Sequence, residues 1–194
     1  EKALCVGLNL TSSNRDTEGI SIEESMDELK ELVRAAGAQV VGEIVQNRSS
    51  VDTATYLGSG KIDEIKNYAE GLDASMVVFN DELSGAQIKN IENIGGKKII
   101  DRTTLILDIF AQRARSKEGK LQVELAQLKY RLPRLYGMGG QMSKTGAGIG
   151  TRGPGEQKLE KDKRHILSRA NNIRKELKEV AKNRDVQRAQ RQKN

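Results

Sequence analysis

The residues best suited to chemistry lie in a glycine-rich stretch, residues 137–155, which holds 8 of the 19 glycines in the chain. Glycine has no Cβ, so backbone amides there can approach phosphate groups closely. Cations within and beside the stretch suit the phosphates of RNA, and its hydroxyl and amide groups suit sugars and base edges. The candidate RNA-contacting residues are Arg131, Arg134, Gly139, Gly140, Gln141, Ser143, Lys144, Thr145, Gly146, Arg152, Gly153, Gly155 and Lys158.

A loop of this length without regular structure is usually either functional or a linker. RNA loops can receive such a segment, because their splayed bases expose their edges. Stacking aromatics are scarce, however, with only Tyr130 and Tyr136 nearby. On composition alone, a plain flexible linker is therefore an equal alternative to an RNA contact.

A second candidate for anion binding is the sequence GSGK at residues 58–61, which precedes a predicted helix. Free amides at a helix N-terminus bind anions, so Gly58, Gly60 and Lys61 are possible phosphate contacts. A P-loop would need glycine five residues before Gly60 and Ser or Thr after Lys61, and this chain has neither. A flexible entry turn is the favoured interpretation, and an ATP-binding α/β domain is the enzyme-class alternative.

Metal and nucleophilic chemistry lack the necessary residue types. One histidine and one cysteine cannot form a metal cluster, and no catalytic set is recognisable. The lone Cys5 cannot form an internal disulfide, which fits a reducing cytoplasm. No apolar run approaches the roughly 18 residues of a membrane span, so no membrane partner is expected.

The net charge of +6 is divided unequally along the chain. Residues 1–116 carry 13 Lys or Arg against 19 Asp or Glu, whereas residues 117–194 carry 20 against 8. A basic half joined to an acidic half indicates a polyanionic partner for the basic half. A solvated helical arm rich in Lys and Arg explains the charge equally well.

The elements that must position these residues follow from the apolar pattern. The first half alternates between apolar runs of strand length and segments of helical periodicity. Strands separated by helices require crossover connections, so we predict an α/β domain over residues 1–116, with a small four-stranded parallel sheet and helices on both faces. The predicted strands are residues 3–10, 38–45, 74–79 and 97–100.

Capping signals mark the helices between these strands. Ser21 with Glu24 and Ser84 with Gln87 form two predicted capping boxes. Gly37 suits the position that follows a helix C-terminus. The last helix of this half, residues 104–115, is predicted to present the apolar face Leu105, Ile106, Ile109 and Phe110.

The second half, residues 117–194, contains two heptad patterns separated by the glycine-rich loop 137–155. Two such helices can bury both patterns against each other as an antiparallel coiled-coil hairpin, for which a monomer is expected. Pairing of the patterns between chains, as a dimerisation arm, is the structural alternative. The patterns are Leu121, Leu125, Leu128, Leu132 and Leu135, then Leu159, Ile166, Ala170, Ile173, Leu177 and Val180.

Three ordered blocks of sequence are distinctive. They are DRTTLILDIFAQRA at residues 101–114, EGKLQVELAQLKYRLPRL at 118–135 and GIGTRGPGE at 148–156. In order and spacing these blocks resemble the HflX family of ribosome-associated GTPases, and YLGSGK at 56–61 resembles it less specifically. The resemblance covers nearly the whole chain.

The resemblance implies an N-terminal α/β subdomain, a helical hairpin with a projecting glycine-rich loop, and then a Ras-like GTPase domain. The chain stops where the strand leading to that domain would be expected, so the resemblance implies a fragment without it. Such a fragment is expected to hold no cofactor and to hydrolyse no GTP. GTP and magnesium would bind elsewhere in the full-length protein.

Family members bind the large ribosomal subunit and place the hairpin loop near the peptidyl transferase centre. The implied partners are therefore that subunit with its ribosomal RNA, and the protein's own GTPase domain. The implied function is ribosome splitting and rescue under stress, in the cytoplasm. ATP binding by the N-terminal part has been suggested for some members, and no motif in this chain supports it.

Overall fold

The computed structural model describes residues 1–11, 19–95, 97–142 and 154–193. The chain divides into two compact units, Glu1–Gln112 and Arg113–Asn194. The division falls close to the boundary predicted between residues 116 and 117.

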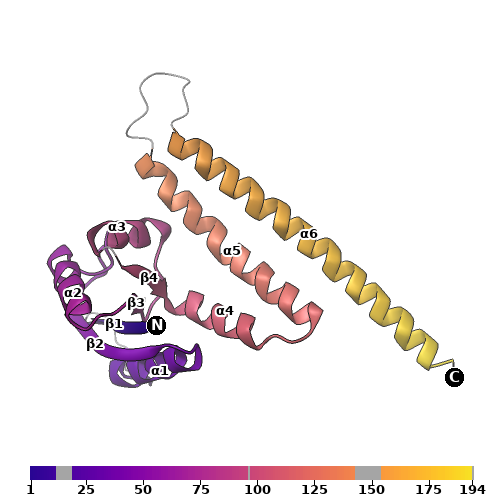
Figure 1. The fold of residues 1–194 in the computed structure, drawn as a ribbon, viewed down its shortest axis with the longest axis horizontal. Helices are drawn as coiled ribbons and strands as arrows, with labels where there is room; N and C mark the ends of the chain where they lie inside the picture. Colours follow the sequence, from indigo (N-terminus) through magenta and orange to yellow (C-terminus); the bar gives the residue numbers. More distant parts are fainter. Residues whose placement is uncertain (12–18, 96, 143–153, 194) are drawn as a thin grey trace. The chain divides into compact units, whose positions relative to one another are not determined.

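The first unit contains a four-stranded sheet in which all neighbouring strands are parallel, as predicted (Figure 1). The strands are β1 (Lys2–Leu10), β2 (Gln39–Arg48), β3 (Met76–Phe79) and β4 (Lys98–Asp101). Their order across the sheet is β2-β1-β3-β4. The connections therefore diverge from β1 and β3, whose carboxyl ends form the switch point where doubly wound sheets bind ligands.

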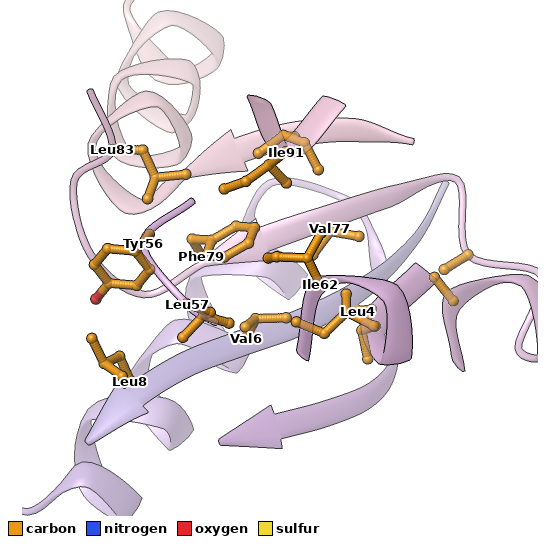
Figure 2. Close-up of a cluster of buried hydrophobic side chains, with 14 residues drawn as sticks. Leu4, Val6, Leu8, Tyr56, Leu57, Ile62, Val77, Phe79, Leu83 and Ile91 are labelled. Carbon is orange, nitrogen blue, oxygen red and sulfur yellow. The ribbon is translucent and has the colours of Figure 1, made fainter. Parts of the chain in front are cut away.

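Four helices cover the two faces of this sheet: α1 (Ile22–Ala35), α2 (Ser59–Gly71), α3 (Gly85–Gly95) and α4 (Arg102–Arg113). Alternate strand residues point to opposite faces. Leu4, Val6 and Phe79 pack with residues of α2 and α3 in one buried cluster (Figure 2). Cys5 and Val78 pack with residues of α1 and α4 in the other. Helices thus cover both faces, as predicted.

The predicted capping box at α3 is confirmed in full, and at α1 the bond to the Ser21 hydroxyl is confirmed. At α1, the Oγ of Ser21 accepts a hydrogen bond from the Glu24 amide at 3.1 Å. At α3 the bonding is reciprocal: the Gln87 amide donates to the Oγ of Ser84 at 3.1 Å, and the Ser84 amide donates to the Oε1 of Gln87 at 2.9 Å. Gly37 has a φ of 89°, in the left-handed region expected after a helix.

The start of α4 differs from the prediction. The helix begins at Arg102, two residues earlier, because Asp101 caps it. One carboxylate oxygen of Asp101 accepts from the Thr104 amide at 3.0 Å, and the other accepts from the Leu83 amide at 3.1 Å. Asp101 is only 1% exposed, so one buried carboxylate ties α4 to the segment after β3.

The prediction that Phe110 belongs to the buried face of α4 is wrong. Leu105 and Ile109 are buried, whereas Phe110 is 57% exposed. At 3.6 residues per turn, Phe110 is rotated by about 100° from Ile109 and about 140° from Leu105. It therefore lies off the side of α4 that packs on the sheet.

The second unit consists of two long helices, α5 (Lys117–Met142) and α6 (Pro154–Arg191). Both extend into the loop predicted at 137–155, so its predicted bounds are wrong at each end. Pro154 suits a first helical position, because the missing N–H has no helical partner there. Pro133 lies inside α5. Among the helices that the structure describes, none combines the length and apolar character of a membrane span.

Candidate nucleic-acid interface

The two helices of the second unit lie side by side and contact each other along the predicted heptad patterns (Figure 1). Leu121 on α5 is buried, as are Ile166, Ala170 and Ile173 on α6. The other apolar residues of the two patterns are half-buried. This apolar seam fixes which faces of α5 and α6 point to solvent.

Among the described residues, ion pairs connect α5 to α6. Arg169 donates to both carboxylate oxygens of Glu124, from Nε at 2.7 Å and from Nη2 at 2.9 Å. Arg184 donates to Glu118 at 3.1 Å. Partner numbers rise along α6 as they fall along α5, so the helices are antiparallel. The hydrogen bonds from Arg169 hold the pKa of Glu124 below its ordinary value.

Three of the predicted RNA contacts lie on the described helices beside the glycine-rich segment. Arg131 on α5 and Lys158 on α6 are exposed. The guanidinium carbon of Arg134 lies 3.2 Å from the centroid of the Tyr130 ring, and its Nη1 donates to the Tyr130 carbonyl at 2.8 Å. Stacking on Tyr130 thus holds Arg134 in one orientation, which suits contact with a phosphate group.

The other predicted contacts lie in or next to the segment between the helices. The backbone of Gly139, Gly140 and Gln141 belongs to α5, and that of Gly155 belongs to the first turn of α6. The remaining predicted contacts lie outside the described residues, and their contacts with RNA stay predictions. They are Ser143, Lys144, Thr145, Gly146, Arg152 and Gly153.

A hollow of ≈120 Å³ lies between α5 and α6, lined by Leu135, Leu159, Glu160 and Lys163. Two leucines and two oppositely charged side chains give it apolar walls with a charged rim. Pockets for small molecules begin at about 300 Å³. As the described residues line it, the hollow is therefore too small for a nucleotide.

The possible anion site at Gly58, Gly60 and Lys61 is only partly assembled. α2 begins at Ser59, where the hypothesis places free amides. The Lys61 amide instead donates to the Gly58 carbonyl at 3.0 Å, and the Gly58 amide donates to the Oε1 of Gln46 at 3.4 Å. However, the ammonium of Lys61 lies 3.2 Å from the carboxylate of Glu64. Lys61 is thus engaged along its own helix instead of at the N-terminus.

Arg48 also lies close to that N-terminus, which the sequence did not reveal. A Cβ at Gly58 would lie 2.7 Å from a guanidinium nitrogen of Arg48, at the far end of a flexible side chain, so a larger residue at position 58 would shift that guanidinium. The chain between them folds back through a bridge joining Asp52 and Tyr56, and no local spacing rule encodes that return. A buried polar side-chain atom without a partner would point to a missing ligand. The described part of the chain has none, so the anion site stays a prediction.

At the switch point of the sheet, polar side chains bond to one another. Asn80 donates from Nδ2 to the Oγ of Ser25 at 2.8 Å, and its Oδ1 accepts from Arg102 at 2.8 Å. Arg102 also lies 2.6 Å from Glu28. The network joins α1, β3 and α4, which favours a structural role. The described residues include no cluster of three side chains suited to a metal ion.

Comparisons with known protein families cover both units. A family model described as GTP-binding GTPase N-terminal matches residues 23–111. A second, described as GTP-binding GTPase Middle Region, matches residues 113–191. The two matches meet where the two compact units meet.

Several curated relatives carry the name GTPase HflX. The protein of Caldanaerobacter subterraneus subsp. tengcongensis is 59% identical over 89% of this chain and 40% of its own length. That of Lacrimispora saccharolytica is 50% identical over 100% of this chain and 44% of its own length. That of Escherichia coli is 43% identical over 84% of this chain and 38% of its own length. The chain thus spans less than half of each relative.

Solved structures share the fold. A GTP-binding protein of Sulfolobus solfataricus in complex with GDP superposes with a TM-score of 0.60 at 25% identity, over 93% of this chain and 46% of that chain. A structure of SsGBP with GDP gives a TM-score of 0.66 at 25% identity, over 95% of this chain and 46% of that one.

Proposed function

Because this chain belongs to the HflX family of GTP-binding proteins and spans its N-terminal and middle regions, we propose that it binds RNA of the large ribosomal subunit. The observation that carries the proposal is the separation of charge between the units. Glu1–Gln112 holds 11 Lys or Arg against 19 Asp or Glu, whereas Arg113–Asn194 holds 22 against 8. Neutralisation of phosphates by such cations supplies most non-specific nucleic-acid affinity.

The packing of α5 against α6 supports a contact at one end of the pair. In an antiparallel pair, the end of one helix and the start of the next lie together. Arg131, Arg134 and Lys158 therefore flank the glycine-rich segment from both sides. Two helices joined by an apolar seam form a stiff support, so the tip can enter RNA loops without losing the packing that carries it.

The activity of a protein with the full length of the relatives is a further part of the proposal. The relatives' name supports GTP hydrolysis. We place GTP, magnesium and catalysis in the part of their length that this chain does not span. Coupling of hydrolysis to RNA binding by the hairpin would separate ribosomal subunits during rescue under stress in the cytoplasm, near the peptidyl transferase centre.

Co-sedimentation with purified large ribosomal subunits across a salt series tests RNA binding. The chain should pellet with subunits at low salt, with log affinity falling linearly against log salt concentration. Lys144→Glu with Arg152→Glu should weaken binding and flatten that dependence. Lys66→Glu with Lys98→Glu, in the first unit, changes the net charge equally and should bind as the unaltered chain does.

Two outcomes count against the proposal. Equal affinity of the Lys144→Glu, Arg152→Glu variant and its control would show that Lys144 and Arg152 do not contact the RNA. Failure of the unaltered chain to bind large subunits at any salt concentration would refute RNA binding by these two regions.

A further inference from the structure

The solvent-facing side of α6 carries a line of polar and cationic residues that the heptad analysis did not single out. Their spacing alternates between three and four residues, which stacks side chains along one face of a helix. All seven are exposed. We name them the outer stripe: Lys161, Arg164, Ser168, Asn171, Lys175, Lys178 and Lys182.

The outer stripe lies roughly opposite the apolar seam, because 3.6 residues per turn place its mean direction about 160° from that of Ile166, Ala170 and Ile173. Those seam residues are buried against α5, so α5 cannot cover the stripe. Over 21 residues at about 1.5 Å each, the stripe extends for about 31 Å.

Acidic residues are sparse along this face. None of the seven positions is acidic, whereas Asp162 and Glu176 on other sides of α6 are half-buried. Glu176 forms an ion pair at 3.7 Å with Arg169, which faces α5. Glu179 is the one exposed acidic residue beside the stripe among residues 157–184. Glu160, one turn before Arg164, forms an ion pair with it at 3.9 Å. The uncompensated charge is therefore concentrated at Lys161, and again at 175–182.

Resting on the proposed function, we propose that the outer stripe binds the sugar-phosphate backbone of double-stranded RNA, as a contact separate from the glycine-rich tip. Five cations spaced over about 31 Å suit a regular line of phosphates. Ser168 and Asn171 lie between the two cationic groups. The Oδ1 of Asn171 accepts from Arg174 at 3.0 Å, so the Ser168 hydroxyl and the Nδ2 of Asn171 are the groups that can bond to ribose hydroxyls, which line the shallow groove of an RNA duplex.

The composition of the stripe favours a duplex over other polyanions. Single strands are held by stacking on aromatic side chains, and the stripe has none. Binding to an anionic membrane surface draws on an apolar face exposed beside the cations. The apolar seam of α6 is packed against α5, and among its described residues Leu167 and Val186 are the large apolar side chains that remain exposed. Base-specific contacts are not expected, because side chains cannot read the deep groove of A-form RNA.

The test compares two variants of the whole chain that lose the same charge. The stripe variant carries Lys161→Gln, Lys175→Gln, Lys178→Gln and Lys182→Gln. The control variant carries Lys66→Gln, Lys89→Gln, Lys97→Gln and Lys98→Gln, all in the first unit. Glutamine forms helices about as well as lysine, so the helix content by circular dichroism should be unchanged.

Fluorescence anisotropy would measure binding to a 20-base-pair RNA duplex, a single-stranded RNA of equal length and poly-L-glutamate, each across a salt series. The unaltered chain should prefer the duplex. The stripe variant should bind the duplex about 10-fold or more weakly at 0.1 M salt, with a shallower salt dependence, and the control variant should not.

Three outcomes would overturn the inference. They are equal duplex affinity of the stripe and control variants, tighter binding to the single strand, and equal binding to poly-L-glutamate. Large subunits, measured in parallel, keep the two proposals distinguishable. If the chain binds large subunits but not the duplex, binding of duplex RNA by the outer stripe is refuted and the proposed function stands. A chain that binds neither would refute both.

Discussion

At the scale of single residues, Asp101 joins three parts of the first unit through one side chain. It ends β4, caps α4 through the Thr104 amide, and accepts from the buried Leu83 amide. Asp101→Ala should lower the free energy of unfolding by about 2–4 kcal/mol, combining a lost cap with an unsatisfied buried amide. Urea denaturation followed by circular dichroism measures this change.

Asp63→Ala is the matched control, because Asp63 is exposed on α2. It should change the free energy of unfolding by about 0.5 kcal/mol or less. If both variants unfold at the same urea concentration, the bonds from Asp101 do not contribute as proposed.

Residue-level prediction succeeded where the interaction is local and failed where it is not. The Ser84–Gln87 capping box spans three residues, so the sequence alone specifies both partners. Arg48 reaches Gly58 only because the intervening chain turns back, and no spacing rule encodes that return. Phe110 fits the apolar spacing of α4, yet which side of a helix packs depends on the sheet beneath it.

At the scale of elements, the Glu124–Arg169 pair should couple α5 to α6 modestly. Both side chains are 40% exposed, so solvent screening limits the coupling to about 0.2–1 kcal/mol. A double-mutant cycle with Glu124→Gln and Arg169→Gln, followed by thermal or urea unfolding, measures that coupling. It should shrink as salt is added.

The coupling also has a defined pH dependence. The pKa of Glu124 is lowered in the folded state, chiefly by its hydrogen bonds with Arg169. The stabilisation is therefore fully present above the ordinary pKa of 4.5 and disappears as the pH falls through the folded value. A coupling that persists in strong acid would contradict the assignment.

The strands and helices could be predicted from the spacing of apolar residues to different degrees. All four strands of the sheet were located, because apolar runs bounded by helical segments leave few other choices. The helices of the second unit were located from their heptads, but their ends were not. Glycines at 137–142 suggested a loop, whereas the backbone of α5 continues to Met142. Helical propensity is weak evidence where neighbouring turns already extend a helix.

At the scale of the whole molecule, the apolar seam is already occupied within one chain. Leu121, Ile166 and Ile173 are buried without a second copy, so these positions of the seam need no partner chain. Light scattering coupled to size exclusion should therefore give a mass near 21.4 kDa. A mass near twice that value, persisting on dilution, would favour pairing of the heptads between chains.

The antiparallel seam also limits how such chains can change in length over evolution. A seven-residue insertion in α5 alone would make α5 longer than α6. The apolar residues of the added heptad would then be exposed. Matched insertions of seven residues in α5 and α6 would preserve every contact and move the tip outward by about 10 Å. Variation in reach among homologous hairpins should therefore occur in paired steps of seven residues.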